Sequence, residues 1–422
     1  MKLFRIGICL LVAFAVLAFG AVEEWAQATL EVGASLLIIL WAVRLQLRKE
    51  EQLFISPQFL PLGFFALIVV TQLTFHTTAS SYHTRVELQL LISYLIVMFL
   101  MSQAYRRASH YRELLWFLMG LGFVVSIFGI LQHLTFNGKL YWFRELRYGG
   151  TPFGPYVDRN HFAGFAELLI PMALVPLALG KVRRERLALV SLFAIVPIIA
   201  LLLTASRGGI VSFAVEMIIL FLLLLVRRIR RRYVLVGGMV VLAAVLGVSW
   251  IGVQHVLQRF STNRVLEVSA GKRASMRQDT WRIFLDHPIL GTGLGTLQLV
   301  FPPYESLYDG KVVNHTHNDY LEALAETGLL GGLCCGWFLV VLLLESLRGL
   351  RELGSSFGAA LNLAGLVGCS GILVHSLVDF NLHIPANALL FFVAGHLATT
   401  RLEGSSLNGP EGSSPRPSRR KQ

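Results

Sequence analysis

Arginine and histidine side chains gather in one long polar segment, residues 252–328, which separates two apolar stretches. The segment carries Arg277 and Arg282 on either side of Trp281, and near its end it holds His315 and His317. An arginine fork pairs bidentately with phosphate, and a histidine can accept a proton from a hydroxyl near neutral pH. Because the segment is too long for a simple connector, we predict that it carries a functional site.

Shorter polar groups stand at the edges of other apolar stretches. Arg207, followed by two glycines, falls on a tight turn between two such stretches, where an arginine either serves a site or extends to the lipid headgroups. Glu216 lies within an apolar stretch, so we expect it to have a partner, in either a structural or a catalytic role. The other groups are Asp158-Arg159-Asn160-His161 and Asp379-Phe380-Asn381-Leu382-His383.

The end of the long segment has the form of a helix start. Asp319 and Glu322 precede an apolar run as in a capping box, which predicts a helix from Tyr320 that ends near Gly328. His317 then lies just before a helix N-terminus, where free N–H groups and a positive partial charge favour a phosphate oxygen. The glycines of residues 291–295 follow no strand, so we expect a turn or a close backbone approach there rather than a dinucleotide site.

The composition requires a membrane. Of the 422 residues, 55% are hydrophobic and only 15% are charged, and the mean hydropathy is +0.64. Because the apolar runs are near the 20 residues that a spanning helix needs, we predict an all-α polytopic membrane bundle of about 12 transmembrane helices, with a large loop on the outer side that contains short helices. The first run also fits a signal peptide. The predicted spans are residues 3–20, 27–43, 58–75, 86–104, 113–134, 161–180, 187–204, 209–226, 233–251, 329–347, 357–378 and 386–400.

These spans divide the chain. We expect transmembrane helices 1–9 in residues 1–251, the large outer loop with the candidate functional residues in 252–328, helices 10–12 in 329–402 and a disordered cytoplasmic tail in 403–422. All four cysteines lie within predicted spans, so we expect no disulfide.

The net charge of +12 reflects orientation. Of the 37 Lys and Arg residues, 24 fall on segments assigned to the cytoplasm and 6 in the short outer loops, which places both termini in the cytoplasm. The positive charge is therefore no sign of a nucleic-acid partner, and we expect none. All six aspartates fall on the outer side, so the working face points away from the cytoplasm.

Arginines and a histidine at the outer edge of a bilayer suit a phosphate-bearing lipid. Arginine can neutralise a departing diphosphate, and histidine can take the proton from an attacking sugar hydroxyl, which contributes about 10²- to 10⁴-fold in rate. The chain has no Asp-X-Asp, P-loop, His-Glu-x-x-His or Gly-x-Ser-x-Gly motif, which disfavours metal-bound nucleotide sugars, ATPases, zinc proteases and serine hydrolases. We expect glycosyl transfer without a metal or a cofactor.

Several motifs together resemble the bacterial O-antigen ligase and O-antigen polymerase superfamily over about residues 155–395. They are Asn160 to Gly164, Ser206 to Gly209, Arg277-x-x-x-Trp281 leading into Pro288-x-x-Gly291-x-Gly293-x-Gly295, and His317 to Gly328. The resemblance implies a bacterial inner-membrane glycosyltransferase with a large periplasmic loop, which would be residues 252–328 and carry catalytic residues. It also implies that the donor is an undecaprenyl-diphosphate-linked glycan and that no metal is required. By motif position it implies that Arg207, Arg277 and His317 are the catalytic residues. Further expected substrate-binding residues are Arg159, Asn160, His161, Arg282, His315, Asn318 and Glu326.

The resulting hypothesis assigns diphosphate binding to Arg207 and Arg277 and general-base catalysis to His317, with inversion at the anomeric carbon. His315 is the rival base. The acceptor is lipid A core in a ligase, a growing glycan in a polymerase or a protein in an O-linking transferase. Other classes that fit are a flippase or transporter for lipid-linked glycans, which needs charges through the depth of the bundle, and a non-catalytic scaffold.

Overall fold

The computed structural model describes residues 1–47, 53–146, 151–226, 234–246, 263–308, 310–352 and 356–402. The predicted tail, the arginines of residues 227–232 and the first part of the long loop, 252–262, lie outside these ranges. Within them the chain is helical, with isolated bridges but no strand. The helices are α1 (Lys2–Leu17), η1 (Phe19–Ala21), α2 (Glu24–Leu47), α3 (Phe59–Thr74), α4 (Ser81–Ala104), α5 (Ala108–Leu134), α6 (Arg159–Ala178), η2 (Arg184–Arg186), α7 (Leu187–Leu203), α8 (Arg207–Val226), Val234–Leu246, α10 (Asn263–Asp286), α11 (Leu297–Val300), η3 (Pro302–Tyr304), α12 (Asp319–Glu352), α13 (Phe357–His375), η4 (Asn381–His383) and α14 (Pro385–Thr399).

Every predicted span overlaps a helix in the described ranges, and residues 233 and 247–251 of the predicted span 233–251 lie outside them. Eight of these helices are long and apolar enough to cross a membrane, while α3, Val234–Leu246 and α14 are apolar but shorter. The all-helical membrane class is therefore confirmed. The total of about 12 spans stays a prediction.

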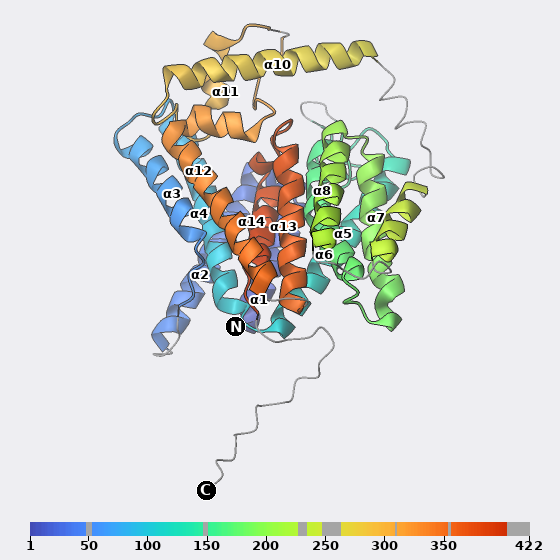
Figure 1. The fold of residues 1–422 in the computed structure, drawn as a ribbon. Coiled ribbons are helices and arrows are strands. Elements are labelled where there is room, and N and C mark those ends of the chain that lie inside the picture. Colours follow the sequence, from blue (N-terminus) through green and yellow to red (C-terminus); the bar gives the residue numbers. More distant parts are fainter. Residues whose placement is uncertain are drawn as a thin grey trace.

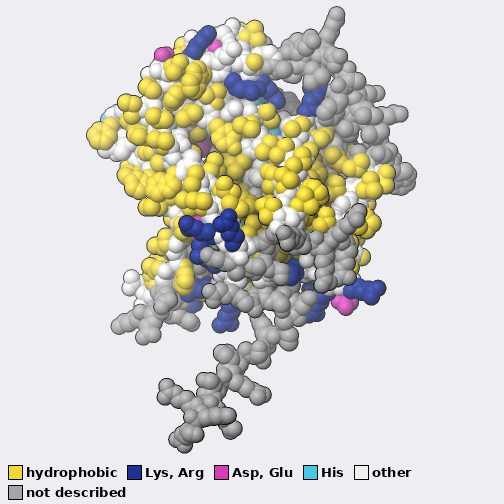
Figure 2. Space-filling view, in the orientation of Figure 1, with side chains coloured by type: hydrophobic (Ala, Val, Ile, Leu, Met, Phe, Trp, Pro, Cys, Tyr) yellow, Lys and Arg dark blue, Asp and Glu magenta, His cyan; other side chains and the backbone are white. Residues whose placement is uncertain are grey.

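The sides of the bundle expose large apolar side chains to the surroundings. Leu36, Leu40 and Val43 of α2 and Leu222 and Leu225 of α8 are all exposed. Figure 2 shows a broad hydrophobic band around the middle of one face, with Lys and Arg concentrated above and below it. A surface of this size and pattern is typical of a protein in contact with lipid.

Two buried helices, α6 and α13, form the centre of the bundle. All of α6 from His161 to Ala178 is buried, which is expected of a helix that is apolar on every side. Small residues let α13 approach its neighbours closely: a Cβ added at Gly365 would lie 2.4 Å from the carbonyl oxygen of Ala394, and one at Gly368 would lie 3.0 Å from that of Leu168. The start of α6 and the end of α13, which carry site residues, are thus held in place by close packing of the two helices.

One helix lies across an end of this bundle. Figure 1 shows α10 crossing that end, while the N-terminus lies at the opposite end. The predicted short helices of residues 252–328 are found in α11 and η3, but α10, with 24 residues, is a long helix that the prediction did not include. A small separate core of Met276, Ile283, Leu297, Phe301, Val313 and Ala325 joins α10 to the first part of α12.

The predicted helix end near Gly328 is confirmed. Gly328 interrupts α12 with φ 65° and ψ −169°, so a short helix from Asp319 precedes the long apolar one. This conformation is open to glycine and strained for other residues. The short helix and α10 together cover one end of the bundle, and the candidate site lies there.

Candidate active site

His317 forms a hydrogen-bonded pair with a carboxylate that lies 62 residues away in sequence. Its Nδ1 lies 3.0 Å from Oδ1 of Asp379, and the Asp379 side chain is 3% exposed whereas that of His317 is 26% exposed. The same carboxylate accepts a hydrogen bond from the backbone N–H of Phe380. A carboxylate on Nδ1 favours the tautomer whose proton is on Nδ1, which makes Nε2 the atom able to accept a proton.

The electrostatics of Asp379 support this arrangement. Burial opposes ionisation of the carboxyl, but the hydrogen bond and positive charge of His317 outweigh it, so the pKa of Asp379 lies below its usual range. Asp379 is therefore a carboxylate at neutral pH. A buried anion of this kind stabilises the imidazolium that forms when His317 takes a proton.

The backbone at His317 is held in an uncommon conformation. Its φ is +53°, in the left-handed region that few residues other than glycine adopt. Backbone strain of this kind is concentrated at functional sites, and here it places the imidazole just before α12.

The first turn of α12 is capped differently from the prediction. Asn318, not Asp319, is the cap: its Oδ1 accepts a hydrogen bond from the N–H of Leu321 at 2.9 Å. Asp319 instead accepts from the N–H of Leu382 and lies 2.7 Å from Nδ1 of His383. The predicted capping box was wrong because tertiary contacts occupy both of its carboxylates.

This helix start is attached to the end of α13. The N–H of Asp319 donates to the carbonyl oxygen of Ser376 at 3.0 Å, and the Asn318 side-chain amide donates to that of Leu377 at 3.1 Å. The carbonyls at a helix C-terminus carry partial negative charge and the N–H groups at an N-terminus partial positive charge, so the contact is favourable. It fixes His317 beside Asp379.

A second cluster of ionisable groups lies next to the first. Glu322 Oε1 lies 2.7 Å from His315 Nδ1 and 3.4 Å from His383 Nε2, while the other oxygen of Glu322 accepts from the N–H of Thr316. Burial of His383 disfavours its charged form, but Glu322 and Asp319 outweigh it and raise the pKa of His383 well above its ordinary value. His383 is thus a cation between two carboxylates.

This cluster also contains the residues best placed to hold a metal ion in the described chain. One ligand atom each from His315, Glu322 and His383 lies within 4.8 Å of the others. Two imidazoles and a carboxylate would suit a divalent transition metal. The positive charge of His383 compensates the carboxylates of Asp319 and Glu322 without a metal ion.

Arg207 is the first residue of α8. Ser206 caps the helix, since its hydroxyl accepts a hydrogen bond from the N–H of Gly209 at 3.2 Å. The preceding Ala205 has φ +50°, which makes the turn from α7 to α8 tight, as predicted. A Cβ added at Gly208 would lie 2.8 Å from His375 Nε2 and 3.1 Å from Val378, so the glycine lets the start of α8 approach the end of α13. Arg207 therefore lies beside the segment that carries Asp379.

The start of α6 meets the same segment. Asp158 caps this helix through the N–H of Asn160 at 2.7 Å, and Arg159 and Asn160 are its first residues, both half-buried. The His161 ring lies 4.8 Å from that of Phe380, which also contacts His317 at 5.0 Å and His315 at 4.3 Å between ring centroids. Phe380 thus brings these imidazoles together.

The crossing helix α10 reaches the segment through Arg273. Its Nη1 donates to the carbonyl oxygen of Val378 at 3.3 Å. Arg277 follows one turn later, and its Nε donates to the carbonyl oxygen of Arg273 at 3.2 Å. The structure therefore brings the turn of Arg277 together with the starts of α6, α8 and α12 around residues 376–380.

Two predicted substrate-binding residues have other partners. Arg282 is 61% exposed and lies 3.2 Å from Asp279, whose other oxygen accepts from the N–H and hydroxyl of Ser306. Glu326 accepts from the N–H groups of Gly295 and Leu297 at 2.9 Å each. Neither contact places the residue at the 376–380 segment.

The glycine-rich stretch is a close backbone approach, as predicted. A Cβ added at Gly291 would lie 2.3 Å from the carbonyl carbon of Glu326, and one at Gly328 would lie 2.2 Å from the carbonyl oxygen of Ile289. Gln72 of α3 joins this contact, donating to the carbonyl oxygen of Glu326 at 2.8 Å. The stretch anchors the loop to the bundle.

Buried ionisable groups lie deeper in the bundle. His375 Nδ1 is 3.1 Å from Glu167 Oε1, and both side chains are fully buried. Glu216 lies against Gly371 of α13 and accepts no hydrogen bond from the described residues, so the partner predicted for it is not found there. Sequence patterns did not single out Glu167 or His375.

A cavity of about 400 Å³ opens beside the second cluster. Apolar residues of α3, α4, α12 and α14 line most of it, while Asp319 and His383 lie at its polar part together with Glu87 and Glu326. Its shape and lining suit an apolar chain that ends in a polar group.

Asp379, Asp319, Glu322 and His383 are the main residues that the predicted site lacked. The sequence did contain a signal, because Asp379 and His383 belong to a polar group on the predicted outer side. The sequence placed that group on the same side as His317 but gave no sign that Asp379 pairs with it.

Comparison with known families bears on this site. No curated protein matches the sequence. A family model described as O-Antigen ligase matches residues 189–336, about a third of the chain, and this stretch contains Arg207, Arg277 and His317. The resemblance to the O-antigen ligase superfamily is therefore confirmed for residues 189–336, which match its family model from α7 to the middle of α12.

Proposed function

We propose that this protein is a membrane glycosyltransferase that moves a glycan from undecaprenyl diphosphate to an acceptor hydroxyl, in the manner of an O-antigen ligase. The observation that carries the proposal is the His317–Asp379 pair, 3.0 Å apart, beside the start of α8 and the α10 turn before Arg277. The family match gives the general reaction class. The roles proposed for individual residues rest on the geometry and charge of the candidate site.

In the proposed reaction, Arg207 and Arg277 bind the donor diphosphate. The N-termini of α6, α8 and α12 add partial positive charge at the same place. The acceptor oxygen attacks the anomeric carbon, its proton passes to Nε2 of His317, and the bond from that carbon to the phosphate oxygen breaks. The electron pair leaves with the diphosphate, and the configuration at carbon inverts.

His317 is favoured over His315 as the base because of its partner. Among the described residues, His317 is the group that acts most strongly on Asp379, whereas Glu322, the partner of His315, is also paired with the charged His383. Asp379 is therefore better able to stabilise an imidazolium at His317 than Glu322 is to stabilise one at His315. Arg159, Asn160, His161 and Asn318 are proposed to contact the substrates at the same place.

We propose that the site lies on the periplasmic side of the bacterial inner membrane with both termini in the cytoplasm, as the distribution of basic residues predicts. A cysteine introduced at exposed Gln298, in α11, should react with an impermeant maleimide in intact spheroplasts, and one at exposed Arg184 should not. The reverse labelling pattern would refute this orientation.

The direct test of the function uses the purified chain, a polyprenyl-diphosphate glycan and separate acceptors: lipid A core, a second lipid-linked glycan and a protein. We expect release of polyprenyl diphosphate together with transfer to one acceptor, which identifies a ligase, a polymerase or an O-linking transferase. Activity should persist in EDTA. His317→Ala should abolish transfer while His315→Ala retains part of it; full transfer by His317→Ala would remove the base assignment.

A lipid-linked glycan flippase is the second candidate, favoured by Glu167, Glu216 and His375 deep in the bundle. It predicts movement of a labelled donor across proteoliposomes with no release of polyprenyl diphosphate. Transfer that persists in Glu216→Gln would favour the glycosyltransferase.

A further inference from the structure

A second pocket lies at the end of the bundle opposite α10. It has a volume of about 240 Å³ and is lined by residues of α5, the end of α6, the α6–α7 connection and the start of α7. Neighbouring contacts place it at that end: Tyr111, one residue before Arg112, lies 3.0 Å from His396 near the end of α14. The pocket is therefore remote from the proposed active site.

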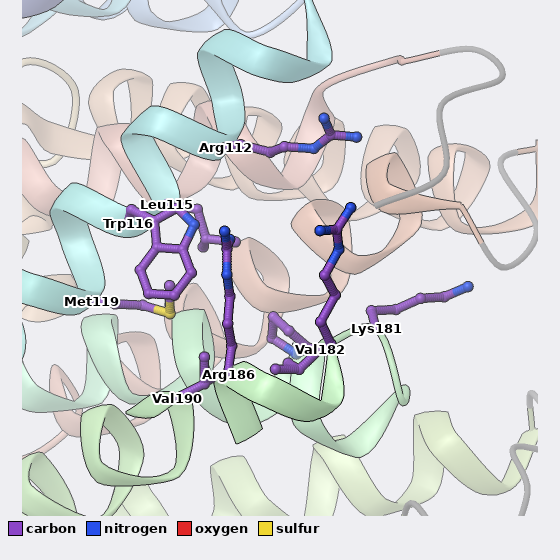
Figure 3. Close-up of a pocket in the computed structure, with 10 residues that line it drawn as sticks. Arg112, Leu115, Trp116, Met119, Lys181, Val182, Arg186 and Val190 are labelled. Carbon is purple, nitrogen blue, oxygen red and sulfur yellow. The ribbon is translucent and has the colours of Figure 1, made fainter. Parts of the chain in front are cut away.

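Basic side chains dominate its rim. Arg112, Lys181, Arg183 and Arg186 line the pocket, and none of its lining residues is acidic. Figure 3 shows Arg112 approaching from α5, and Lys181 and Arg186 from the α6–α7 connection. Four cations around one small volume create a strong field for an anion.

The floor of the pocket is apolar. Leu115, Trp116 and Met119 come from the same face of α5 as Arg112, spaced by three and four residues, and Val182 and Val190 complete the lining with Pro176. The guanidinium carbon of Arg186 lies 5.4 Å from the centre of the Trp116 ring. Tryptophan and arginine are typical of the membrane–water interface, where one part of a ligand is charged and the other is apolar.

Exposed apolar side chains of α7 follow the pocket residues directly in sequence. Directly after Arg186, the side chains of Leu187, Leu189 and Leu192 on α7 are exposed. A ligand with its phosphate among the basic residues can therefore lay an acyl chain along α7 without leaving the bilayer. A free phosphate would use the rim and leave this apolar surface unused.

We propose that this pocket binds the phosphate headgroup of an anionic membrane phospholipid. The basic rim holds the phosphate, the Trp116 side supports the glycerol region, and the acyl chain follows α7. Basic pockets between transmembrane helices are known to hold such headgroups. The proposal depends on membrane insertion of the chain but not on its enzymatic activity.

Native mass spectrometry of the purified full chain tests the proposal. The detergent-solubilised protein is titrated with phosphatidylglycerol, with phosphatidylcholine of the same acyl chains, and separately with glycerol phosphate and inorganic phosphate. We expect phosphatidylglycerol to bind at least about tenfold more tightly than phosphatidylcholine. Because each basic residue near an anionic lipid contributes about 1 kcal/mol, equivalent to about fivefold in affinity, Arg112→Gln combined with Arg186→Gln should weaken binding about 25-fold.

A matched control removes two other basic residues from the same end. Arg184 and Arg351 are exposed and do not line the pocket, so Arg184→Gln with Arg351→Gln should bind phosphatidylglycerol as the unaltered protein does. The single variant Arg186→Gln, at an exposed position, should fold normally and bind about fivefold more weakly. Equal loss in the pocket and control pairs, or undiminished binding by the pocket pair, would overturn the proposal. Glycerol phosphate or inorganic phosphate binding as tightly as the lipid would also overturn it, in favour of a soluble phosphate ligand.

Discussion

The replacement Asp379→Asn isolates the contribution of the carboxylate to the proposed base. The change keeps the shape of the side chain but removes its charge and offers an N–H group to His317. An amide that donates to Nδ1 favours the tautomer with its proton on Nε2. In that tautomer Nε2 is already protonated and cannot take the proton of the attacking hydroxyl. The lost charge-assisted hydrogen bond is worth about 1.5–3 kcal/mol, equivalent to about 10- to 150-fold in rate. The tautomer error costs more, about 10⁴-fold in catalytic triads, so we expect kcat to fall by about 10²- to 10⁴-fold.

The assay measures release of polyprenyl diphosphate at several donor concentrations. Because Asp379 is proposed to contact His317 and not the donor, the KM for the donor should change less than about threefold. The matched control is Glu345→Gln, which also converts a largely buried, paired carboxylate to an amide but lies near Arg401, away from the site. It should retain activity. An Asp379→Asn variant with full kcat, or one whose loss is entirely in KM, would refute the assignment of His317 as base and Asp379 as its positioning residue.

The pH dependence gives a second measure of the same pair. The pKa of Asp379 is lowered on folding: burial acts against this, but the hydrogen bond and charge of His317 prevail. A lowered carboxyl pKa adds stability that is present above the ordinary value of about 3.9 and is lost as the pH falls through the folded value. The unfolding midpoint of the unaltered protein should therefore exceed that of Asp379→Asn near pH 5, and the two should converge in more acidic solution.

Three further predictions test other parts of the site. Arg277→Lys keeps the charge but loses the planar fork, so transfer should fall at least about tenfold, whereas Arg282→Lys, at an exposed position paired with Asp279, should change it less than about threefold. The raised pKa of His383 adds stability that is complete below about pH 6.5 and disappears as the pH rises through the folded value; His383→Gln should remove this fall in unfolding midpoint on the alkaline side. Gly208→Ala places a methyl group 2.8 Å from His375 Nε2, so it should destabilise the protein by about 1–3 kcal/mol and reduce transfer as Arg207 is displaced; unchanged melting and activity would contradict the close approach of α8 to α13.

The spans were predictable because a bilayer imposes a simple rule on sequence. A helix that crosses it needs about 20 apolar residues, and this requirement can be read locally. The helix end at Gly328 and the close approach of the glycine-rich stretch were predictable for a similar reason, since glycine is required where the backbone is left-handed or crowded. In both cases the physical constraint acts within a few residues.

The roles of the carboxylates depend instead on distant contacts. Asp319 and Glu322 have the spacing of a capping box, yet His383 and His315 occupy them, so Asn318 caps the helix. Glu326 and Arg282 looked suited to substrate, but Gly295 and Asp279 are their partners. A carboxylate is satisfied by whichever donor the fold brings nearest, and residues far away in sequence supply those donors.

The convergence of helix starts explains how four separate motifs make one site. Helices α6, α8 and α12 begin at the same end of the bundle, capped by Asp158, Ser206 and Asn318. Each exposes N–H groups there, and each has an arginine or histidine next to its cap: Arg159, Arg207 or His317. Helix dipoles alone bind anions weakly when water screens them, and here three helix N-termini and the side chains next to their caps act at one place, below the crossing α10. The positive field of the site is thus built into the bundle, and in the proposed reaction the diphosphate, rather than the sugar, would position the donor.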